Sequence, residues 1–182
     1  MAFCHTLAVI WMENRLKTPG LVLALALLTG NAVAQDPMRG QYVAQLGGCV
    51  NCHTEDKKGA APFAGGRALK TPFGTFYGPN ITPHPQAGIG RWSEADFIQA
   101  MRQGQRPDGA HYYPAFPYPS FTKIFDSDLK DLWSYLQTLP PSVRPSQEHE
   151  LRFPFGFRIL NLIWKWLFFL PAHLSTISQN RS

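Results

Sequence analysis

The stretch Gly47-Gly48-Cys49-Val50-Asn51-Cys52-His53 decides how the rest of the 182-residue sequence is interpreted. Two residues separate its cysteines, and a histidine follows the second cysteine directly. This C-x-x-C-H pattern is the attachment sequence of c-type haem, in which two sulfurs bond to two vinyl groups of one porphyrin. The histidine then lies beneath the iron as its proximal axial ligand. We therefore expect one haem c, bound covalently by Cys49 and Cys52 and ligated by His53.

A thioredoxin-like redox pair and half of a zinc site are the competing interpretations of these residues. The redox pair needs a βαβ context, which the surrounding sequence lacks. The zinc site needs a second pair of ligands at suitable spacing, and the sequence has none. Neighbouring thiols in an oxidising compartment otherwise form a disulfide, so haem attachment also explains what occupies both sulfurs.

The N-terminus has the three parts of a secretory signal peptide, over residues 1–34. Arg15 and Lys17 supply the positive end, and residues 21–28 form a short apolar core. Ala32-Val33-Ala34 then provides the small-residue cleavage pattern. These features predict export to the periplasm.

The signal would have a more ordinary length if it began at Met12, and we expect this methionine to be the initiator. Cys4 and His5 would then have no functional role. An uncleaved anchor is the alternative, but the apolar run is shorter than the ~20 residues that span a membrane.

Composition excludes several classes of protein. Hydrophobic residues make up 45% of the chain, which indicates a globular protein rather than a disordered one. The formal charge of +5 comes from scattered residues with no basic run, so we expect no nucleic-acid partner. No Ser/His/Asp order, phosphate loop or paired acid site points to a hydrolase or a kinase.

Three helices are predicted around the attachment stretch. Met38 to Cys49 can form the first, in which Gly40 would let another helix approach closely. The second runs from an N-cap signature at Ser93 to Gly104, and the third from Asp126 to Leu139, before two prolines. Long loops rich in Gly, Pro and aromatic residues separate them. A haem explains such loops, because the cofactor replaces part of the side-chain core.

Six short motifs follow one another in order along the chain. They are Cys49-Val50-Asn51-Cys52-His53-Thr54, Pro72-Phe73-Gly74-Thr75, Asn80-Ile81-Thr82-Pro83, Gly88-Ile89-Gly90-Arg91-Trp92-Ser93, Tyr113-Pro114-Ala115-Phe116-Pro117-Tyr118 and Leu132 to Leu139. With them, residues 39–169 resemble one haem domain of the cytochrome c subunits of membrane-associated periplasmic dehydrogenases. The resemblance implies an all-α, class I-like cytochrome c domain over residues 35–145, with long Gly/Pro-rich loops.

The same resemblance implies what the protein does. Members of that family relay electrons from a quinoprotein, flavoprotein or molybdenum dehydrogenase toward membrane quinone or a terminal oxidase. It therefore implies a non-catalytic electron-transfer protein, with a periplasmic dehydrogenase and a downstream respiratory acceptor as partners. Such subunits usually carry several haem domains in series, whereas this sequence has one attachment pattern.

The sequence offers more than one candidate for the sixth ligand of the iron. Many family members place a methionine in the Tyr-Pro-Ala-x-Pro-Tyr loop, where this chain has Phe116. Another family pattern has Phe in the loop and a methionine in the preceding helix, which matches Met101 and favours it as the distal ligand. His111 is the alternative ligand, and core packing is the alternative role of Met101. An open sixth position would instead suit binding of small ligands or peroxide.

Four further residues carry a donor that buried haem propionates would need, although each could equally be an ordinary loop residue. The other histidines, His84, His149 and His173, are expected in solvent. The four candidates are Arg67, Asn80, Trp92 and Tyr118.

Residues 146–182 are expected to form a linker and an aromatic, amphipathic tail. Arg158, Asn161 and Lys165 share one narrow face of its predicted helix, and apolar side chains fill the broad opposite side. About fourteen helical residues span roughly 21 Å, less than the ~30 Å hydrocarbon core of a bilayer. Residues 151–170 could lie on the inner membrane, dock on a partner, or fold back onto their own haem domain.

Overall fold

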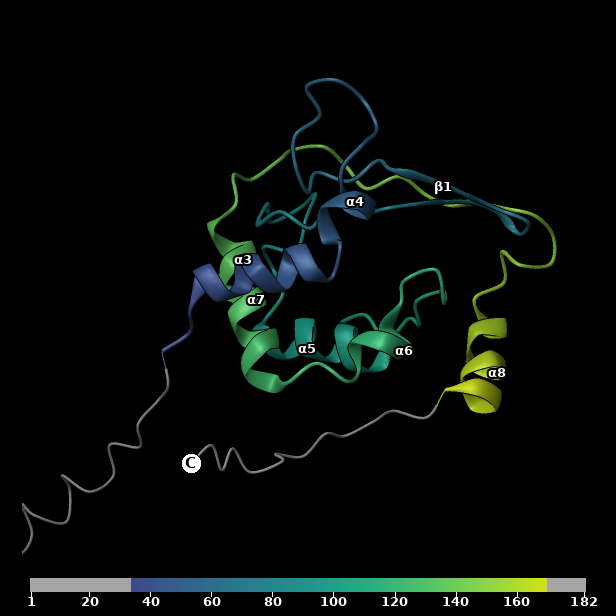
Figure 1. Cartoon of the computed structure of the whole chain (residues 1–182). Helices are drawn as coiled ribbons and strands as arrows, with labels where there is room; N and C mark the ends of the chain where they lie inside the picture. The colour runs from purple at the N-terminus through teal and green to yellow at the C-terminus, as the bar shows by residue number, and fades with distance from the viewer. Residues whose placement is uncertain (1–33, 170–182) are drawn as a thin grey trace, which may run out of the picture. The chain divides into compact units, whose positions relative to one another are not determined.

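Two crossing helices, α3 (Pro37–Leu46) and α7 (Asp126–Thr138), pack along each other in the computed structural model, which describes residues 34–169 (Figure 1). A Cβ added at Gly40 would lie 2.0 Å from the backbone oxygen of Asp131 and 2.7 Å from the Cβ of Tyr135. Only a glycine lets the two helix backbones approach so closely. The close approach predicted from Gly40 is confirmed, and the expected signal peptide lies outside the described residues.

The first predicted helix is interrupted before the attachment residues. Helix α3 ends at Leu46, and Gly48 takes a left-handed conformation with φ 64°. A separate short helix, α4 (Cys49–His53), then carries both cysteines and the histidine. The break at Gly47 and Gly48 changes the direction of the chain, so that α4 is not a continuation of α3.

The other two predicted helices are confirmed. Helix α5 (Glu94–Gln103) begins with the expected capping box, in which the Ser93 side chain and Asp96 bond reciprocally, and ends at Gly104 with φ 57°. Buried Arg102 donates hydrogen bonds to the carbonyl oxygens of Thr122 and Ile124. These bonds fix α5 against the turn between α6 (Tyr118–Phe121) and α7. The apolar stripe of α7, formed by Leu129, Leu132 and Leu136, is at most 2% exposed.

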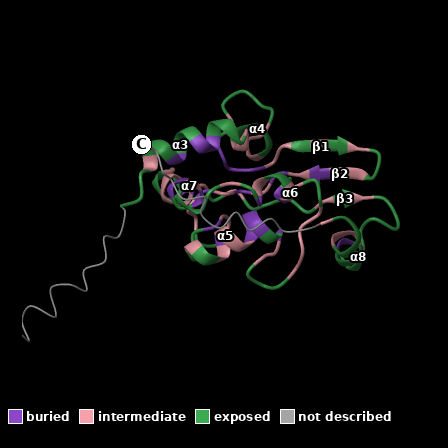
Figure 2. Cartoon of the chain, turned by 60° about the horizontal axis from the view of Figure 1, so that its bottom comes forward, coloured by how far each residue is buried: buried purple, intermediate pink, exposed green. Residues whose placement is uncertain are grey.

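The expectation of an all-α fold is wrong in one respect, because a three-stranded antiparallel sheet lies beside the helices (Figure 2). Strand β1 (Ala68–Thr71) pairs with β2 (Gly74–Tyr77) in a register that sets Thr71 opposite Gly74. Strand β3 (Glu150–Leu151) adds to β2 from far along the chain. The strands are only two to four residues long, and they lie in segments that the sequence predicted to be loops or linkers.

Asn80 ties the segment after α7 to the body of the domain. Its side chain is 2% exposed and donates both amide hydrogens, to the carbonyl oxygens of Ser142 (2.9 Å) and Arg144 (2.8 Å). Its Oδ1 accepts from both the backbone N–H and the hydroxyl of Thr82. The chain that leads toward β3 is thereby held along the Asn80 loop rather than free in solvent.

The predicted tail helix is present as α8 (Ile159–Phe168), shorter than expected. Its ten residues extend about 15 Å. Within residues 34–169, no helix has the length and apolar character needed to cross a membrane.

Candidate haem-attachment site

Helix α4 presents two free thiols on consecutive turns of chain. Cys49 is half-buried and Cys52 is exposed, and neither forms a disulfide. Burial raises the pKa of the Cys49 thiol to about 11. Across residues 34–169, no three His, Cys, Asp or Glu side chains are grouped to hold a metal ion.

His53 is held in the tautomer that an iron ligand needs. Its Nδ1 lies 2.7 Å from the carbonyl oxygen of Pro79, which can only accept, so Nδ1 carries the proton. Burial lowers the pKa of His53, which favours the neutral ring. The lone pair on Nε2 is therefore free for iron. The acceptor is fixed by close packing, since a Cβ on neighbouring Gly78 would lie 1.7 Å from the Cys52 carbonyl oxygen.

The other three described histidines show the opposite arrangement. Each uses Nδ1 as a hydrogen-bond acceptor, so the proton of the neutral ring lies on Nε2. Among residues 34–169, His53 alone thus presents an Nε2 lone pair. The donors are the backbone N–H of Ala87 to His84 (3.0 Å), the backbone N–H of Tyr77 to His149 (3.1 Å), and Lys165 Nζ to His111 (2.8 Å).

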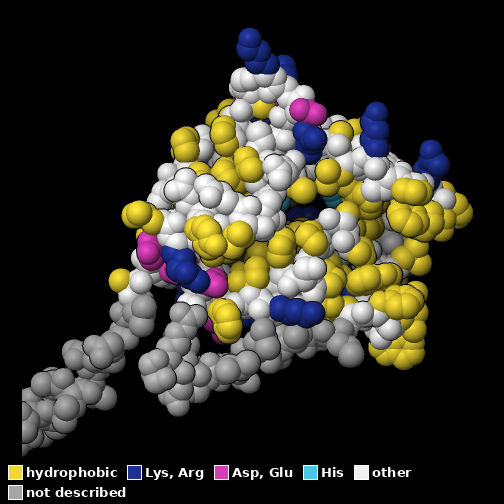
Figure 3. Space-filling view, viewed as in Figure 1, with side chains coloured by type: hydrophobic (Ala, Val, Ile, Leu, Met, Phe, Trp, Pro, Cys, Tyr) yellow, Lys and Arg dark blue, Asp and Glu magenta, His cyan; other side chains and the backbone are white. Residues whose placement is uncertain are grey.

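A hollow lies between the positions of α4 and α6, and Figure 3 shows hydrophobic side chains along part of its rim, with histidine and Lys or Arg side chains inside it. Cys49 and Phe116 pack against the buried apolar cluster that also contains Phe97 and Met101. Two thiols, a correctly protonated histidine and an apolar wall together fit a covalently attached haem.

The family assignment follows from the sequence around this site. The family model of cytochrome c matches residues 37–140, which is more than half of the chain. The chain belongs to the cytochrome c family. This match also supports the expected class I-like fold, and covalently bound haem c is the cofactor of the family.

Curated relatives of this cytochrome include the cytochrome subunits of dehydrogenases. The "Diheme cytochrome c-type" protein of Cereibacter sphaeroides is 43% identical over 162 residues, covering 87% of this chain and 52% of that protein. The cytochrome c subunit of alcohol dehydrogenase (quinone) from Gluconacetobacter polyoxogenes is 41% identical, covering 86% and 35%. The cytochrome c subunit of gluconate 2-dehydrogenase from Pantoea cypripedii is 39% identical, covering 81% and 35%. The resemblance predicted from the motifs is confirmed, and the cytochrome spans about half or less of these relatives' lengths.

Met101 is buried on the inner side of α5. It is 5% exposed, and it is the one buried methionine among the described residues, since Met38 is 82% exposed. Phe116, in the Tyr113–Tyr118 loop, is half-buried and packs against the rings of Tyr112 and Phe121. The loop therefore contributes an aromatic wall, and Met101 is the thioether inside the apolar cluster.

Tyr118 is the one candidate propionate contact that carries an unsatisfied polar atom. It is fully buried, and its hydroxyl has no hydrogen-bond partner among the described residues. Burial raises its pKa to about 12. An unpaired buried hydroxyl costs about 1–3 kcal/mol, so the position fits a site completed by a polar group outside the protein chain.

The other three candidates have different surroundings. Arg67 forms a surface ion pair with Asp56 at 3.0 Å. Asn80 has no amide hydrogen left for a propionate, because both are donated to the segment after α7. Trp92 is half-buried against the central apolar cluster. The structure brings Cys49, Cys52 and His53 together on one helix, whereas Arg67 and Asn80 are already paired elsewhere.

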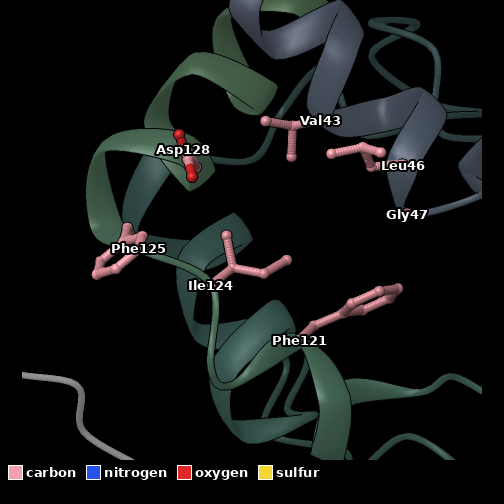
Figure 4. A pocket seen from close by; sticks show the side chains of 7 residues that line it. All are labelled: Val43, Leu46, Gly47, Phe121, Ile124, Phe125 and Asp128. Atoms are coloured by element: carbon pink, nitrogen blue, oxygen red, sulfur yellow. The ribbon is translucent and has the colours of Figure 1, made fainter.

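An apolar groove beside Cys49 was not anticipated from the sequence. Its volume is about 300 Å³, and it lies between the end of α3 and the α6–α7 turn (Figure 4). A Cβ on Gly47 in its wall would lie 3.4 Å from Cys49 Sγ, so this wall of the groove lies close to the Cys49 sulfur. No single motif could have revealed it, because its walls come from separate segments. The lining residues are Val43, Leu46, Gly47, Phe121, Ile124, Phe125 and Asp128.

Acid is expected to destabilise this cytochrome through His111. Its pKa is lowered below 6.5 by burial and by nearby Lys165. The folded state thus prefers the neutral His111 ring. This preference stabilises the fold fully at a pH above the pKa that His111 has in the unfolded chain. The stabilisation is lost as the pH falls through the lower pKa of His111 in the folded protein. Denaturant unfolding between about pH 7.5 and about pH 5 should show a falling free energy of unfolding. The fall should be smaller in His111→Gln, which keeps an acceptor but does not titrate; parallel curves would contradict this prediction.

Proposed function

We propose that this cytochrome is an exported monohaem electron-transfer protein. Cys49 and Cys52 would bond to the haem, and His53 would ligate its iron from the proximal side. The observation that carries the proposal is the His53–Pro79 hydrogen bond, which frees Nε2 beside two free thiols. The bound haem would supply a one-electron ferric/ferrous couple, while the chain holds and encloses it.

We infer that its partners are a periplasmic dehydrogenase and a downstream acceptor of the respiratory chain. Support comes from relatives named as cytochrome c subunits of alcohol, gluconate and fructose dehydrogenases. The cytochrome itself would transform no metabolite. The signal pattern at residues 1–34 supports the periplasm as its location, in association with the inner membrane.

The distal ligand we propose is Met101. Its thioether lies in the apolar cluster that Cys49 contacts, whereas the loop offers Phe116. His111 is less suitable, because its Nδ1 accepts from Lys165 and its Nε2 therefore holds the proton. Thioether ligation favours ferrous iron and raises the reduction potential, which suits a relay.

Absorption spectra and potentials of the periplasmically matured protein test this proposal. Wild-type protein should be low-spin with a weak long-wavelength sulfur-to-iron band, and Met101→Leu should lose that band. The reduction potential of Met101→Leu should be lower than that of the wild type by on the order of 100 mV, within the ~0.8 V range over which axial ligands set haem potentials. Met38→Leu, at a methionine that is 82% exposed, is the matched control and should change neither property.

Phe116 also motivates a second candidate function, a five-coordinate haem protein that binds small ligands or peroxide. A high-spin wild-type spectrum with rapid carbon monoxide binding to the reduced protein would support that candidate and reject Met101. An unchanged low-spin spectrum in Met101→Leu would reject Met101 and show that another side chain is the sixth ligand. The electron-transfer proposal would then still stand, because the iron would remain six-coordinate.

A further inference from the structure

Helix α8 rests on the haem domain by its polar face. Lys165 Nζ donates to the carbonyl oxygens of Gln103 and Gly104, at the C-terminal end of α5, and to His111 Nδ1 at 2.8 Å. A cation at this position is favoured, because the last carbonyls of a helix are unpaired and carry partial negative charge. This contact holds one end of α8 firmly against the domain.

The side of α8 that faces the haem domain carries two further polar side chains, Arg158 and Asn161. Arg158 donates to the carbonyl oxygen of His111 (3.3 Å) and lies 5.1 Å from the centre of the Tyr113 ring. Asn161 is 5% exposed, although its Nδ2 has no partner among the described residues. Trp164 adds an aromatic contact to Tyr118. An amphipathic helix normally buries its apolar side against its own domain, so this orientation is reversed.

The apolar side of α8 consequently faces outward. We define its outer face as Ile159, Leu162, Ile163, Trp166, Leu167 and Phe168. Trp166 is 85% exposed, Phe168 70% and Ile159 60%. The preceding loop adds Phe153, which is 85% exposed, and Figure 3 shows hydrophobic side chains gathered along this edge of the molecule. An apolar surface of this extent marks an interaction site.

The chemistry of the outer face matches a lipid surface. Residues 151–169 contain no Asp or Glu, so no carboxylate of this segment would meet the phosphate headgroups, while its cations Arg158 and Lys165 are directed inward against the domain. Trp and Phe are the side chains that favour the membrane interface. A protein interface usually carries a hydrogen bond per ~100–200 Å², whereas Trp166 supplies the one side-chain donor on the outer face.

We infer that the outer face of α8, with the loop around Phe153, lies in the interface of a phospholipid bilayer and holds the haem domain against it. The inward contacts of Lys165 and Arg158 make α8 a rigid part of the domain, so binding would fix the orientation of the domain on the membrane. This inference rests on the proposed export for its place in the cell, but on no property of the haem.

Vesicle flotation of the periplasmically matured, haem-loaded protein tests the inference. Vesicles of phosphatidylethanolamine and phosphatidylglycerol should carry the wild-type protein upward. Trp166→Glu/Phe168→Glu should lower the partition coefficient by at least about tenfold, because two charges would have to enter the interface. Met38→Glu, which changes a similarly exposed side chain on α3, should float like the wild type.

Three results would overturn the inference. These are wild-type protein that stays with the soluble fraction, a double variant that floats like the wild type, or flotation lost equally in Met38→Glu. Light scattering without lipid distinguishes a protein partner: self-association that disappears in the double variant, with no flotation of the wild type, would assign the face to a second copy.

The haem spectrum of each variant separates this inference from the proposed function. Because the two mutated side chains are exposed, we expect an unchanged spectrum and an intact fold. Should the milder Trp166→Ser also float less than the wild type while keeping its spectrum, misfolding is excluded as the cause. Flotation by a wild-type protein with no covalent haem would reject the electron-transfer proposal and leave the membrane inference standing.

Discussion

Replacing Cys49 and Cys52 together by serine is expected to abolish covalent haem and to lower the yield of haem-loaded protein by at least about tenfold. Both thiols lie on α4, one helical turn apart, and both are free. Without the two thioether bonds, His53 would be the sole proximal attachment. The hollow in front of α4 would then lose its occupant, and the apolar walls around it would lose their packing.

Haem-specific staining of denaturing gels measures the covalent bond directly, because only a thioether-linked haem stays with the unfolded chain. Each single variant should retain weak staining through its remaining cysteine. Val50→Ala, at a position between the two cysteines that is 37% exposed, is the matched control, and its staining should equal that of the wild type. Full staining of the double variant would reject the attachment that we propose.

Gly40→Ala is expected to lower the free energy of unfolding by about 3 kcal/mol. The new Cβ would lie 2.0 Å from the backbone oxygen of Asp131, which cannot move without separating α3 from α7. The substitution also favours the helix by up to ~1 kcal/mol, but this gain is smaller than the cost of the overlap. Denaturant unfolding of the haem-loaded protein would measure the loss.

Gly156→Ala provides a comparison at a glycine with no heavy atom within 4 Å of the added Cβ. Its stability should stay within about 0.5 kcal/mol of the wild type. If Gly40→Ala is as stable as Gly156→Ala, the two helices do not cross as closely as the structure has them.

The features that the sequence predicted correctly depend on local signals. Ser93 with Asp96 three residues later marks the start of α5, and Gly104 marks its end. A helix boundary is set by a few neighbouring backbone groups, so its signature lies within a few residues. The order of the six short motifs also indicated the family correctly, because motif order can be read from the sequence without knowing the fold.

The features that the sequence did not reveal depend on pairing across the chain. Strand β3 adds to β2 from more than seventy residues away, and two residues carry no periodic pattern. Asn80 had the donors that a propionate would need, but its partners are carbonyls at Ser142 and Arg144. Every residue has a backbone carbonyl oxygen, so the residue types at positions 142 and 144 do not indicate that they accept hydrogen bonds from Asn80.

The sequence by itself determined the cofactor chemistry, because the spacing of Cys49, Cys52 and His53 is a local requirement of a single porphyrin. The tertiary structure decided which histidine presents a free Nε2, since Pro79 and Lys165 set opposite tautomers on His53 and His111. It also decided which side of α8 faces outward. An amphipathic pattern defines two faces of a helix, but only the carbonyls at the end of α5 attract Lys165 and thereby turn the apolar face away from the domain.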